Sequence, residues 1–214
     1  MKTIALIDYG SGNLHSAARA LRVAAHEAGT DSEIILTADP QIIARADRIV
    51  LPGVGHFADC AANLRAAQGL IEALSEAVLK RAVPFMGICV GQQLLATTGY
   101  EDGETPGLNW ISGTVDQITP GAGYRIPHMG WNQLEIAKPH PVLVDLGADP
   151  HVYFTHSYAY RDAAEADIAA STTYGQPMIA AVAHDNIFGT QFHPEKSQRV
   201  GLKILANFIL WAPS

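Results

Sequence analysis

Short apolar runs alternate with longer stretches of helical periodicity through the first half of the chain. Apolar runs bounded by turn residues are typical of buried strands, and apolar residues repeating every three to four positions are typical of amphipathic helices. The pattern predicts strands at 3–8, 33–36, 48–51 and 83–88, and helices at 14–29, 40–46, 58–68 and 70–81. Strands and helices in alternation form a parallel sheet with right-handed crossovers, covered on both faces.

The second half of the chain has a different pattern. Its strand-like runs lie at 113–118, 132–136, 152–157, 178–184 and 187–192, and a last helix is expected at 200–211. From about residue 110 to 184, Gly- and Pro-rich turns join the strands, which is typical of antiparallel pairing. We therefore predict one α/β domain over residues 1–214: a central, mostly parallel sheet flanked by helices, with an antiparallel extension.

Composition narrows the classes of function. The net charge is −7 and no basic stripe is visible, which argues against a nucleic acid as the primary partner. Two cysteines give no disulfide framework and fit a reducing compartment. The first apolar run is too short for a signal peptide and no segment approaches a membrane span, so the prediction is a cytoplasmic protein without membrane contact.

The strongest chemical signal is Cys89, which ends an apolar run and lies between Gly87 and Gly91. Gly-x-Cys-x-Gly is the thiol version of the nucleophile elbow, a tight strand-to-helix turn. The helix N-terminus favours the thiolate, and the Val90 amide can face a developing oxyanion. The second cysteine, Cys60, has no such context and is expected to be buried and inert.

A base and its orienting carboxylate lie far downstream. His193 follows a strand-like run, and Pro194 favours an extended backbone at the histidine. In an extended segment, residues two apart point to the same side, so Glu195 can hold the His193 imidazole while it takes the thiol proton. The remaining histidines without such context are expected to be surface or capping residues, and these are His15, His26, His140, His151 and His184.

The glycines at Gly10 and Gly12 could suggest a dinucleotide site after the first strand. However, the third glycine of the G-x-G-x-x-G fingerprint is missing, and no acidic residue ends a second strand at the usual distance. No cofactor and no metal site are predicted.

With these residues in place, the chain resembles the class I (triad) glutamine amidotransferases. The order Cys, His, Glu and the phrase Gln-Phe-His-Pro-Glu-Lys-Ser at 191–197 carry the resemblance, which runs from the first strand to the last helix. More narrowly, the phrases at 8–14, 51–55, 127–132 and 196–197 resemble the glutaminase subunits of imidazole glycerol phosphate synthases, in histidine biosynthesis.

The resemblance implies roles for individual residues. It implies Cys89 as nucleophile, His193 as acid and base, and Glu195 as the partner of the histidine. The oxyanion hole would be formed by the Val90 amide and the loop Gly53, Val54 and Gly55. The residues implied to bind glutamine are Gln93, Glu101, His156, Ser157 and Tyr158.

The resemblance also implies a reaction and a partner. Glutamine would be hydrolysed to glutamate and ammonia through a Cys89 thioester. The ammonia would pass to a TIM-barrel cyclase subunit, which makes imidazole glycerol phosphate and AICAR, so the assembly would be a heterodimer. The residues expected at that interface are Asn13, Trp131, Tyr153 and Lys196. Core packing remains an alternative for the two aromatic residues, and a solvated charge for Lys196.

Other functions remain open at this point. The chain could be the glutaminase subunit of another biosynthetic enzyme, such as that for pyridoxal phosphate or anthranilate. A stand-alone γ-glutamyl hydrolase or cysteine peptidase on the same scaffold would need no partner. A non-catalytic regulatory subunit is disfavoured because Cys89, His193 and Glu195 are all present.

Overall fold

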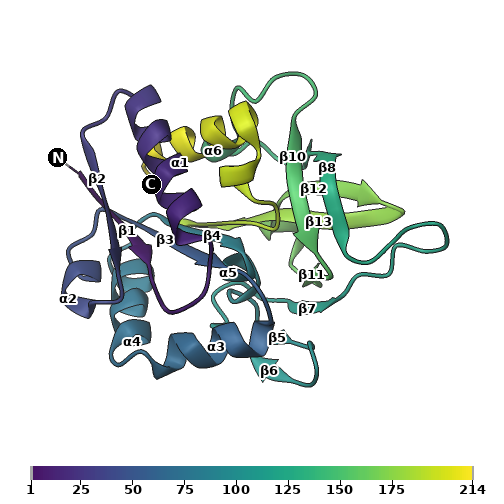
Figure 1. The fold of residues 1–214 in the computed structure, drawn as a ribbon, viewed down its shortest axis with the longest axis horizontal. Helices are drawn as coiled ribbons and strands as arrows, with labels where there is room; N and C mark the ends of the chain where they lie inside the picture. The colour runs from purple at the N-terminus through teal and green to yellow at the C-terminus, as the bar shows by residue number, and fades with distance from the viewer. Residues whose placement is uncertain (1, 214) are drawn as a thin grey trace.

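The computed structural model describes residues 2–213, and its centre is an eight-stranded sheet. The five strands at one side pair in parallel and the remaining three pair antiparallel, so the predicted mostly parallel sheet with an antiparallel extension is confirmed (Figure 1). In spatial order the strands are β2 (Ser32–Thr37), β1 (Lys2–Ile7), β3 (Arg48–Gly53), β4 (Phe85–Cys89), β14 (Ile187–Thr190), β13 (Gln176–His184), β12 (Ile168–Tyr174) and β9 (Glu135–Ile136).

Helices cover both faces of the parallel half (Figure 1). On one face α1 (Leu14–Glu27) packs along α6 (Gln198–Leu210), because the buried stripe of α1 is mostly alanine and allows a close approach. The other face carries α2 (Pro40–Ile43), α3 (Phe57–Ala66) and α4 (Leu70–Ser75), which continues into a π-helical turn (Glu76–Lys80). The remaining helical turns are α5 (Val90–Gln93), η2 (Pro141–Leu143), η3 (Glu165–Asp167) and η4 (Pro194–Lys196).

The second half also forms two smaller sheets, which the sequence did not predict. The runs at 113–118 and 152–157 belong to these sheets and not to the main sheet. The first becomes β7 (Thr114–Gln117), in a four-stranded sheet with β11 (Tyr158–Arg161), β5 (Thr98–Gly99) and β6 (Thr105–Pro106). The second becomes β10 (His151–His156), which pairs only with β8 (His128–Gln133). The strand predicted at 132–136 is divided between β8 and β9, which belong to different sheets.

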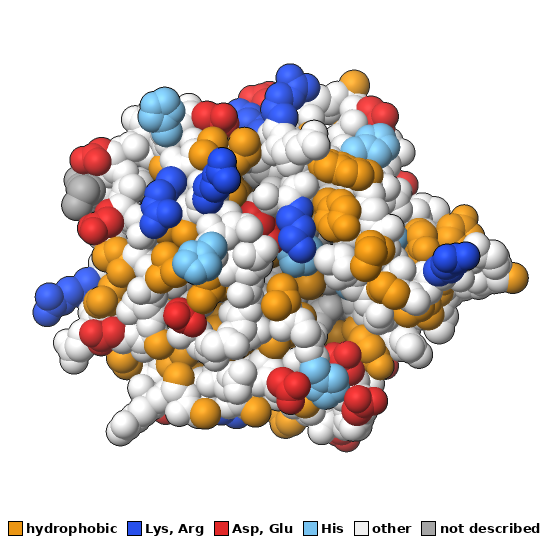
Figure 2. Space-filling view, viewed as in Figure 1, with side chains coloured by type: hydrophobic (Ala, Val, Ile, Leu, Met, Phe, Trp, Pro, Cys, Tyr) orange, Lys and Arg blue, Asp and Glu red, His pale blue; other side chains and the backbone are white. Residues whose placement is uncertain are grey.

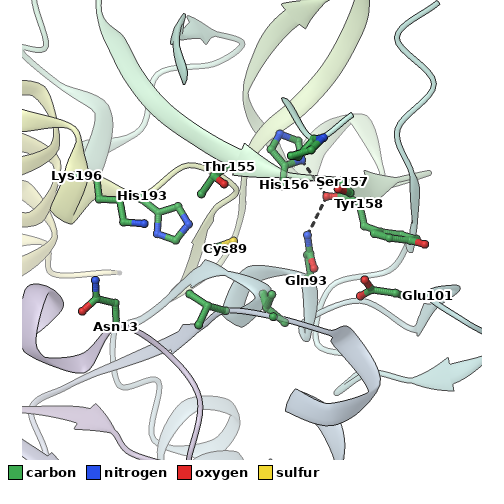
Figure 3. Close-up of a pocket in the computed structure, with 14 residues that line it drawn as sticks. Asn13, Cys89, Gln93, Glu101, Thr155, His156, Ser157, Tyr158, His193 and Lys196 are labelled. Carbon is green, nitrogen blue, oxygen red and sulfur yellow. Dashed lines mark hydrogen bonds between the residues drawn. The ribbon is translucent and has the colours of Figure 1, made fainter. Parts of the chain in front are cut away.

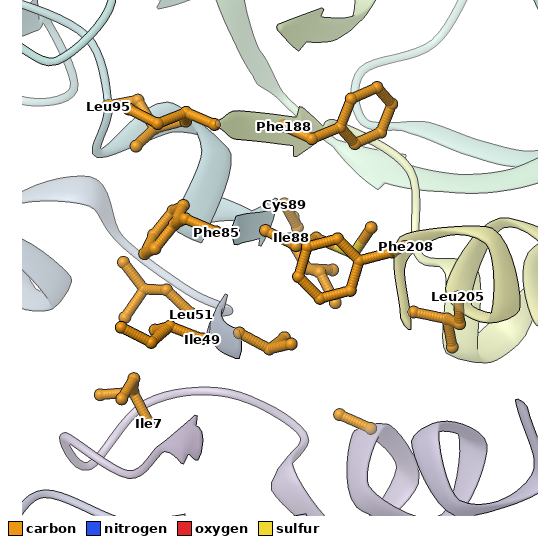
Figure 4. Packing of buried hydrophobic residues seen from close by; sticks show 14 of the residues in the cluster. Ile7, Ile49, Leu51, Phe85, Ile88, Cys89, Leu95, Phe188, Leu205 and Phe208 are labelled. Atoms are coloured by element: carbon orange, nitrogen blue, oxygen red, sulfur yellow. The ribbon is translucent and has the colours of Figure 1, made fainter. Parts of the chain in front are cut away.

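The core lies between the parallel strands and the two helical layers. Phe85, Phe188 and Phe208 are fully buried there, from a central strand, its neighbour and the last helix (Figure 4). Arg48 is also buried and donates hydrogen bonds to the carbonyls of Phe208 and Trp211. Its side chain therefore connects the start of β3 to the end of α6. This packing holds the carboxyl ends of β3, β4 and β14 side by side, where the candidate site lies.

Candidate active site

Cys89 lies on a tight turn between β4 and α5. Its backbone has φ 56° and ψ −113°, a conformation that costs free energy for a residue with a side chain. The turn is close-packed: a Cβ on Gly87 would overlap the Gly91 carbonyl, and a Cβ on Gly91 would overlap the Leu51 carbonyl of β3. The elbow therefore requires both glycines, and it presents a nearly buried thiol above a helix N-terminus.

The structure brings His193 and Glu195 together beside this turn. His193 Nδ1 lies 2.7 Å from Glu195 Oε1, and both side chains are almost completely buried. The His193 amide donates to the Tyr153 carbonyl, and Ser197 Oγ donates to the His193 carbonyl, so the backbone is held at both ends of the residue. The imidazole is thereby fixed with Nδ1 on the carboxylate and Nε2 free for the thiol.

The charge state of His193 is set by these neighbours. Burial disfavours the imidazolium, but the interactions with the Cys89 side chain and with Glu195 outweigh it and raise the pKa of His193 to about 10. The Nε2 atom has no conventional hydrogen-bond partner among the described residues. A cysteine–histidine pair in this state is equipped for nucleophilic attack followed by proton donation to a leaving group.

These side chains face a pocket of about 540 Å³. Figure 3 shows Cys89 between His193 and Lys196 on one side and Gln93, Tyr158 and Glu101 on the other. The lining of this pocket contains ten of the twelve residues expected to be catalytic, to form the oxyanion hole or to bind substrate. They are Cys89, His193, Val90, Val54, Gly55, Gln93, Glu101, His156, Ser157 and Tyr158.

Gln93 is held in one orientation at the side of this pocket. Its Nε2 donates to the Tyr158 carbonyl at 2.9 Å and to Gln191 Oε1 at 3.0 Å (the first bond is dashed in Figure 3). Both amide protons are therefore used, and Oε1 remains as an acceptor. That atom suits an ammonium group of a bound amino acid.

Glu101 lies at the same end of the pocket. Its Oε2 accepts the Phe57 amide at 2.7 Å and so caps the N-terminus of α3. This anchors the carboxylate and leaves its second oxygen for a ligand. The pocket thus offers a carboxylate and an amide oxygen to a cation, at the end away from Lys196.

In the loop at 53–55, the Val54 peptide is hydrogen-bonded to neighbouring side chains. The Val54 amide donates to Ser11 Oγ at 3.3 Å, and the Val54 carbonyl accepts from Ser11 Oγ at 2.8 Å and from Cys60 Sγ at 3.4 Å. The Val54 N–H is therefore engaged away from the thiol. Gly53 is tightly enclosed, because a Cβ there would meet the Gly91 amide and the Tyr9 hydroxyl. Gly55, at φ 96°, has open space around it.

The four residues predicted to contact a partner gather at the mouth of the pocket. Trp131 and Tyr153 form an edge-to-face pair with ring centroids 6.0 Å apart, and Lys196 Nζ lies 6.0 Å over the Tyr153 ring. Asn13 and Lys196 line the pocket itself. Trp131 is 47% exposed, so it is not a core residue. Figure 2 shows hydrophobic side chains gathered on this half of the face, over β8 and β10.

Sequence reasoning missed a buried histidine pair behind the pocket. His128 Nδ1 lies 3.0 Å from His156 Nε2, and His156 Nδ1 lies 2.9 Å from the Tyr158 carbonyl. Burial lowers the pKa of each histidine to about 4, so both are neutral. Because a carbonyl only accepts, His156 donates from Nδ1 and His128 donates to His156. His128 belongs to the motif at 127–132, but its partner could not be found without the β8–β10 pairing.

Cys60 is buried and unpaired, as predicted. Of the histidines expected to be surface or capping residues, His140 is partly buried: it stacks on Phe188, and its Nδ1 accepts the Val142 amide as a cap. No group of three or more His, Cys, Asp or Glu side chains in residues 2–213 could hold a metal ion. Within the same range no helix is long and apolar enough to cross a membrane.

The fold agrees with comparisons to known proteins. The model of the class-I glutamine amidotransferase family matches residues 5–212. The chain therefore belongs to the class I glutamine amidotransferases, which are glutamine-hydrolysing enzymes.

Several curated relatives carry one particular name within this family, imidazole glycerol phosphate synthase subunit HisH. The protein of Caulobacter vibrioides is 53% identical over the full length of both chains. That of Rhodospirillum rubrum is 53% identical over 98% of this chain and 99% of its own. The predicted family and the predicted subunit type within it are both confirmed by these relatives.

Solved structures support the fold alone. A putative GMP synthase component of Thermoplasma acidophilum superimposes with a TM-score of 0.66 at 22% identity, covering 98% of this chain and 92% of its own. A glutamine amidotransferase of Thermotoga maritima superimposes with a TM-score of 0.59 at 17% identity, covering 93% and 78% respectively.

Proposed function

We propose that this chain hydrolyses glutamine at Cys89 and delivers the ammonia to a TIM-barrel cyclase subunit, which makes imidazole glycerol phosphate and AICAR. The observation that carries the proposal is the convergence of the Cys89 elbow, the His193–Glu195 pair and an amino-acid-binding wall on one pocket. A reducing cytoplasm suits an enzyme with two unpaired cysteines.

The reaction begins with binding of glutamine across the pocket. Gln93 Oε1 and Glu101 accept from the α-ammonium group, which directs the side-chain amide toward Cys89. The Cys89 sulfur attacks the amide carbon, and the imidazolium of His193 donates a proton to the departing nitrogen. A glutamyl thioester and ammonia result.

The second half of the reaction releases glutamate. His193, now neutral, takes a proton from water, and the hydroxide attacks the thioester carbon. Glu195 keeps the imidazole oriented throughout and stabilises its charged form. The negative oxygen in both steps is held by the Val90 amide and by one amide of the loop at 53–55 once that loop has turned.

The same loop gives the partner a proposed role. The Val54 amide is engaged with Ser11, so this amide is not free to act as an oxyanion donor in the isolated chain. Loss of one donor costs on the order of a hundredfold or more in rate. Docking of the cyclase on Asn13, Trp131, Tyr153 and Lys196 next to this loop would stabilise the turned state, and would also exclude water from the ammonia path.

One domain over residues 1–214 is part of the proposal. Its support is that β14, near the end of the chain, pairs with β4 of the first half, so neither half has a complete sheet.

The test is glutamate release by the chain alone, with the cyclase subunit, and with the cyclase and its nucleotide ligand. We expect low, intermediate and high rates in that order. Full-rate hydrolysis by the chain alone would contradict the gating and favour the stand-alone hydrolase. No stimulation by this cyclase, but stimulation by a pyridoxal phosphate or anthranilate synthase, would identify a different partner.

A further inference from the structure

One buried polar side chain at the site has no part in the reaction described above. Gln191 is fully excluded from solvent, two residues before His193. Its backbone amide donates to the Ala180 carbonyl at 2.8 Å, which fixes the residue against β13. Its side-chain Nε2 lies 3.8 Å from Cys89 Sγ, within the range of an N–H···S hydrogen bond. A buried amide that points at a reactive sulfur requires a chemical explanation.

The orientation of the Gln191 amide follows from its neighbours. Amide oxygen and nitrogen are assigned from the hydrogen-bond network, and here the network allows one assignment. The Tyr158 carbonyl can only accept, so the Gln93 atom 2.9 Å from it must be the NH₂ group. That same NH₂ group faces Gln191 at 3.0 Å, so the Gln191 atom there must be the oxygen. The NH₂ group of Gln191 is thereby directed to the sulfur.

We propose that Gln191 is a further catalytic residue, which donates a hydrogen bond to the Cys89 sulfur and stabilises the thiolate. The inference rests on the proposed role of Cys89 as nucleophile. When the S–H bond breaks, its proton goes to His193 Nε2 and the electron pair stays on sulfur. Gln191 keeps its own protons and only orients one N–H toward the new charge, where a hydrogen bond is stronger than to a neutral thiol.

This role also fits the later steps. In the thioester the sulfur is uncharged and the hydrogen bond from Gln191 is weak. When water attacks and the thiolate leaves, the bond strengthens again and favours release of glutamate. Gln93 contributes twice, because it presents Oε1 to the substrate and holds Gln191 through its NH₂ group.

The neighbouring Gln92 offers a matched control. It is also fully buried and lies in the same elbow, but neither atom of its side-chain amide has a hydrogen-bond partner among the described residues. Gln191→Met and Gln92→Met both replace a buried glutamine by an apolar side chain of similar length. Only the first removes an N–H from the sulfur.

The experiment measures alkylation of Cys89 by iodoacetamide as a function of pH, with peptide mass spectrometry to separate Cys89 from Cys60. For Gln191→Met we expect the rate at pH 7 to fall about tenfold, the equivalent of about 1.4 kcal/mol, while the limiting rate at high pH is retained. For Gln92→Met we expect the wild-type profile. Glutamate release in the presence of the cyclase should fall in parallel, through kcat rather than KM.

A second variant keeps the test sound if Gln191→Met does not fold. Gln191→Glu retains an oxygen for Gln93 and places a carboxyl group without an N–H at the sulfur, so alkylation at pH 7 should slow even further. Three results would overturn the proposal. In the variant that folds, the rate of Cys89 alkylation at pH 7 could lie within twofold of wild type, or the rate could fall equally at every pH. Gln92→Met could also slow alkylation as much as the Gln191 variant does. Glutamate release that survives in Cys89→Ala would instead overturn the nucleophile assignment itself.

Discussion

At the scale of single residues, the site depends on pairs whose members set each other's chemistry. His193 is charged because Cys89 and Glu195 lie on either side of it, and burial alone would have made it neutral. Gln93 presents an oxygen to the pocket because Tyr158 and Gln191 take both of its protons. His156 is neutral because it is buried, and it donates from Nδ1 because the Tyr158 carbonyl there can only accept. Each role is thus a property of the pair.

Cys89→Ala should reduce glutamine-dependent turnover to below about one-thousandth of wild type while the fold is retained. The same change removes an interaction that raises the pKa of His193, so the imidazole should titrate below the wild-type value of about 10 in an NMR experiment. Because the pKa of His193 is raised above the ordinary 6.5, its protonation stabilises the folded protein. This contribution to the free energy of unfolding is complete below pH 6.5 and is lost as the pH rises through about 10.

When the pH is raised from 6.5 to about 10, the free energy of unfolding should therefore fall less in Cys89→Ala than in wild type. Ammonia-dependent synthesis by the partner should continue in this variant. Glutamate release above the stated limit would mean that another group is the nucleophile.

At the scale of elements, two tight backbone approaches shape the site: the elbow against β3, and the loop at 53–55 against the loop after β1. The first is rigid, since three glycines meet there without room for a methyl group. In the second, the Val54 peptide is held by side-chain hydrogen bonds to Ser11 and Cys60. The proposed nucleophile therefore lies on a close-packed turn, beside a loop proposed to supply an oxyanion donor.

Gly91→Ala should destabilise the protein by about 3 kcal/mol, because the added methyl group overlaps the Leu51 carbonyl and forces α5 away from β3. Denaturant unfolding measures the change. Gly29→Asn is the control, since Gly29 has φ 65° with open space around it and Asn adopts that conformation readily. Equal stability of both variants would contradict the close approach.

Ser11→Ala should raise glutamate release by the isolated chain about fivefold. The hydroxyl holds the Val54 peptide away from the thiol, and a neutral hydrogen bond is worth about 1 kcal/mol. Cys60→Ala removes the weaker contact to the Val54 carbonyl and a contact to Ser11 Oγ, but leaves the Ser11–Val54 hydrogen bonds in place, and should have a smaller effect. Lower basal activity in Ser11→Ala would show that Ser11 supports the active arrangement of the loop instead.

At the scale of the whole molecule, the pocket opens beside the aromatic pair Trp131 and Tyr153, of which Trp131 is exposed, so the proposed docking region adjoins the pocket. Trp131 is 47% exposed and Met129 is 62% exposed, on the strand that also carries His128. Large exposed apolar side chains next to an active site are typical of a protein interaction surface.

Trp131→Ala should weaken binding of the cyclase by about thirtyfold, since truncation of an aromatic hot spot costs about 2 kcal/mol or more. Isothermal titration measures the affinity. Leu79→Ala is the control, because Leu79 is 53% exposed on the π-helical turn after α4, on the opposite side of the sheet. Equal affinity of Trp131→Ala and wild type would place the interface elsewhere.

The sequence by itself determined the alternating strands and helices of the first half, the elbow at Cys89 and the His193–Glu195 pair, because each depends on local periodicity or on neighbours within a few residues. Only the tertiary structure decided where β8 and β10 pair, since that pairing joins distant segments. It also decided that β12 is a strand, although its small and polar residues do not indicate one: β13 and β9 pair with it on both sides. The direction of the Val54 amide and of the Gln191 side chain depends on Ser11 and Gln93, which are far away in sequence. Contacts of that kind leave no local pattern, so the order of residues along the chain does not reveal them.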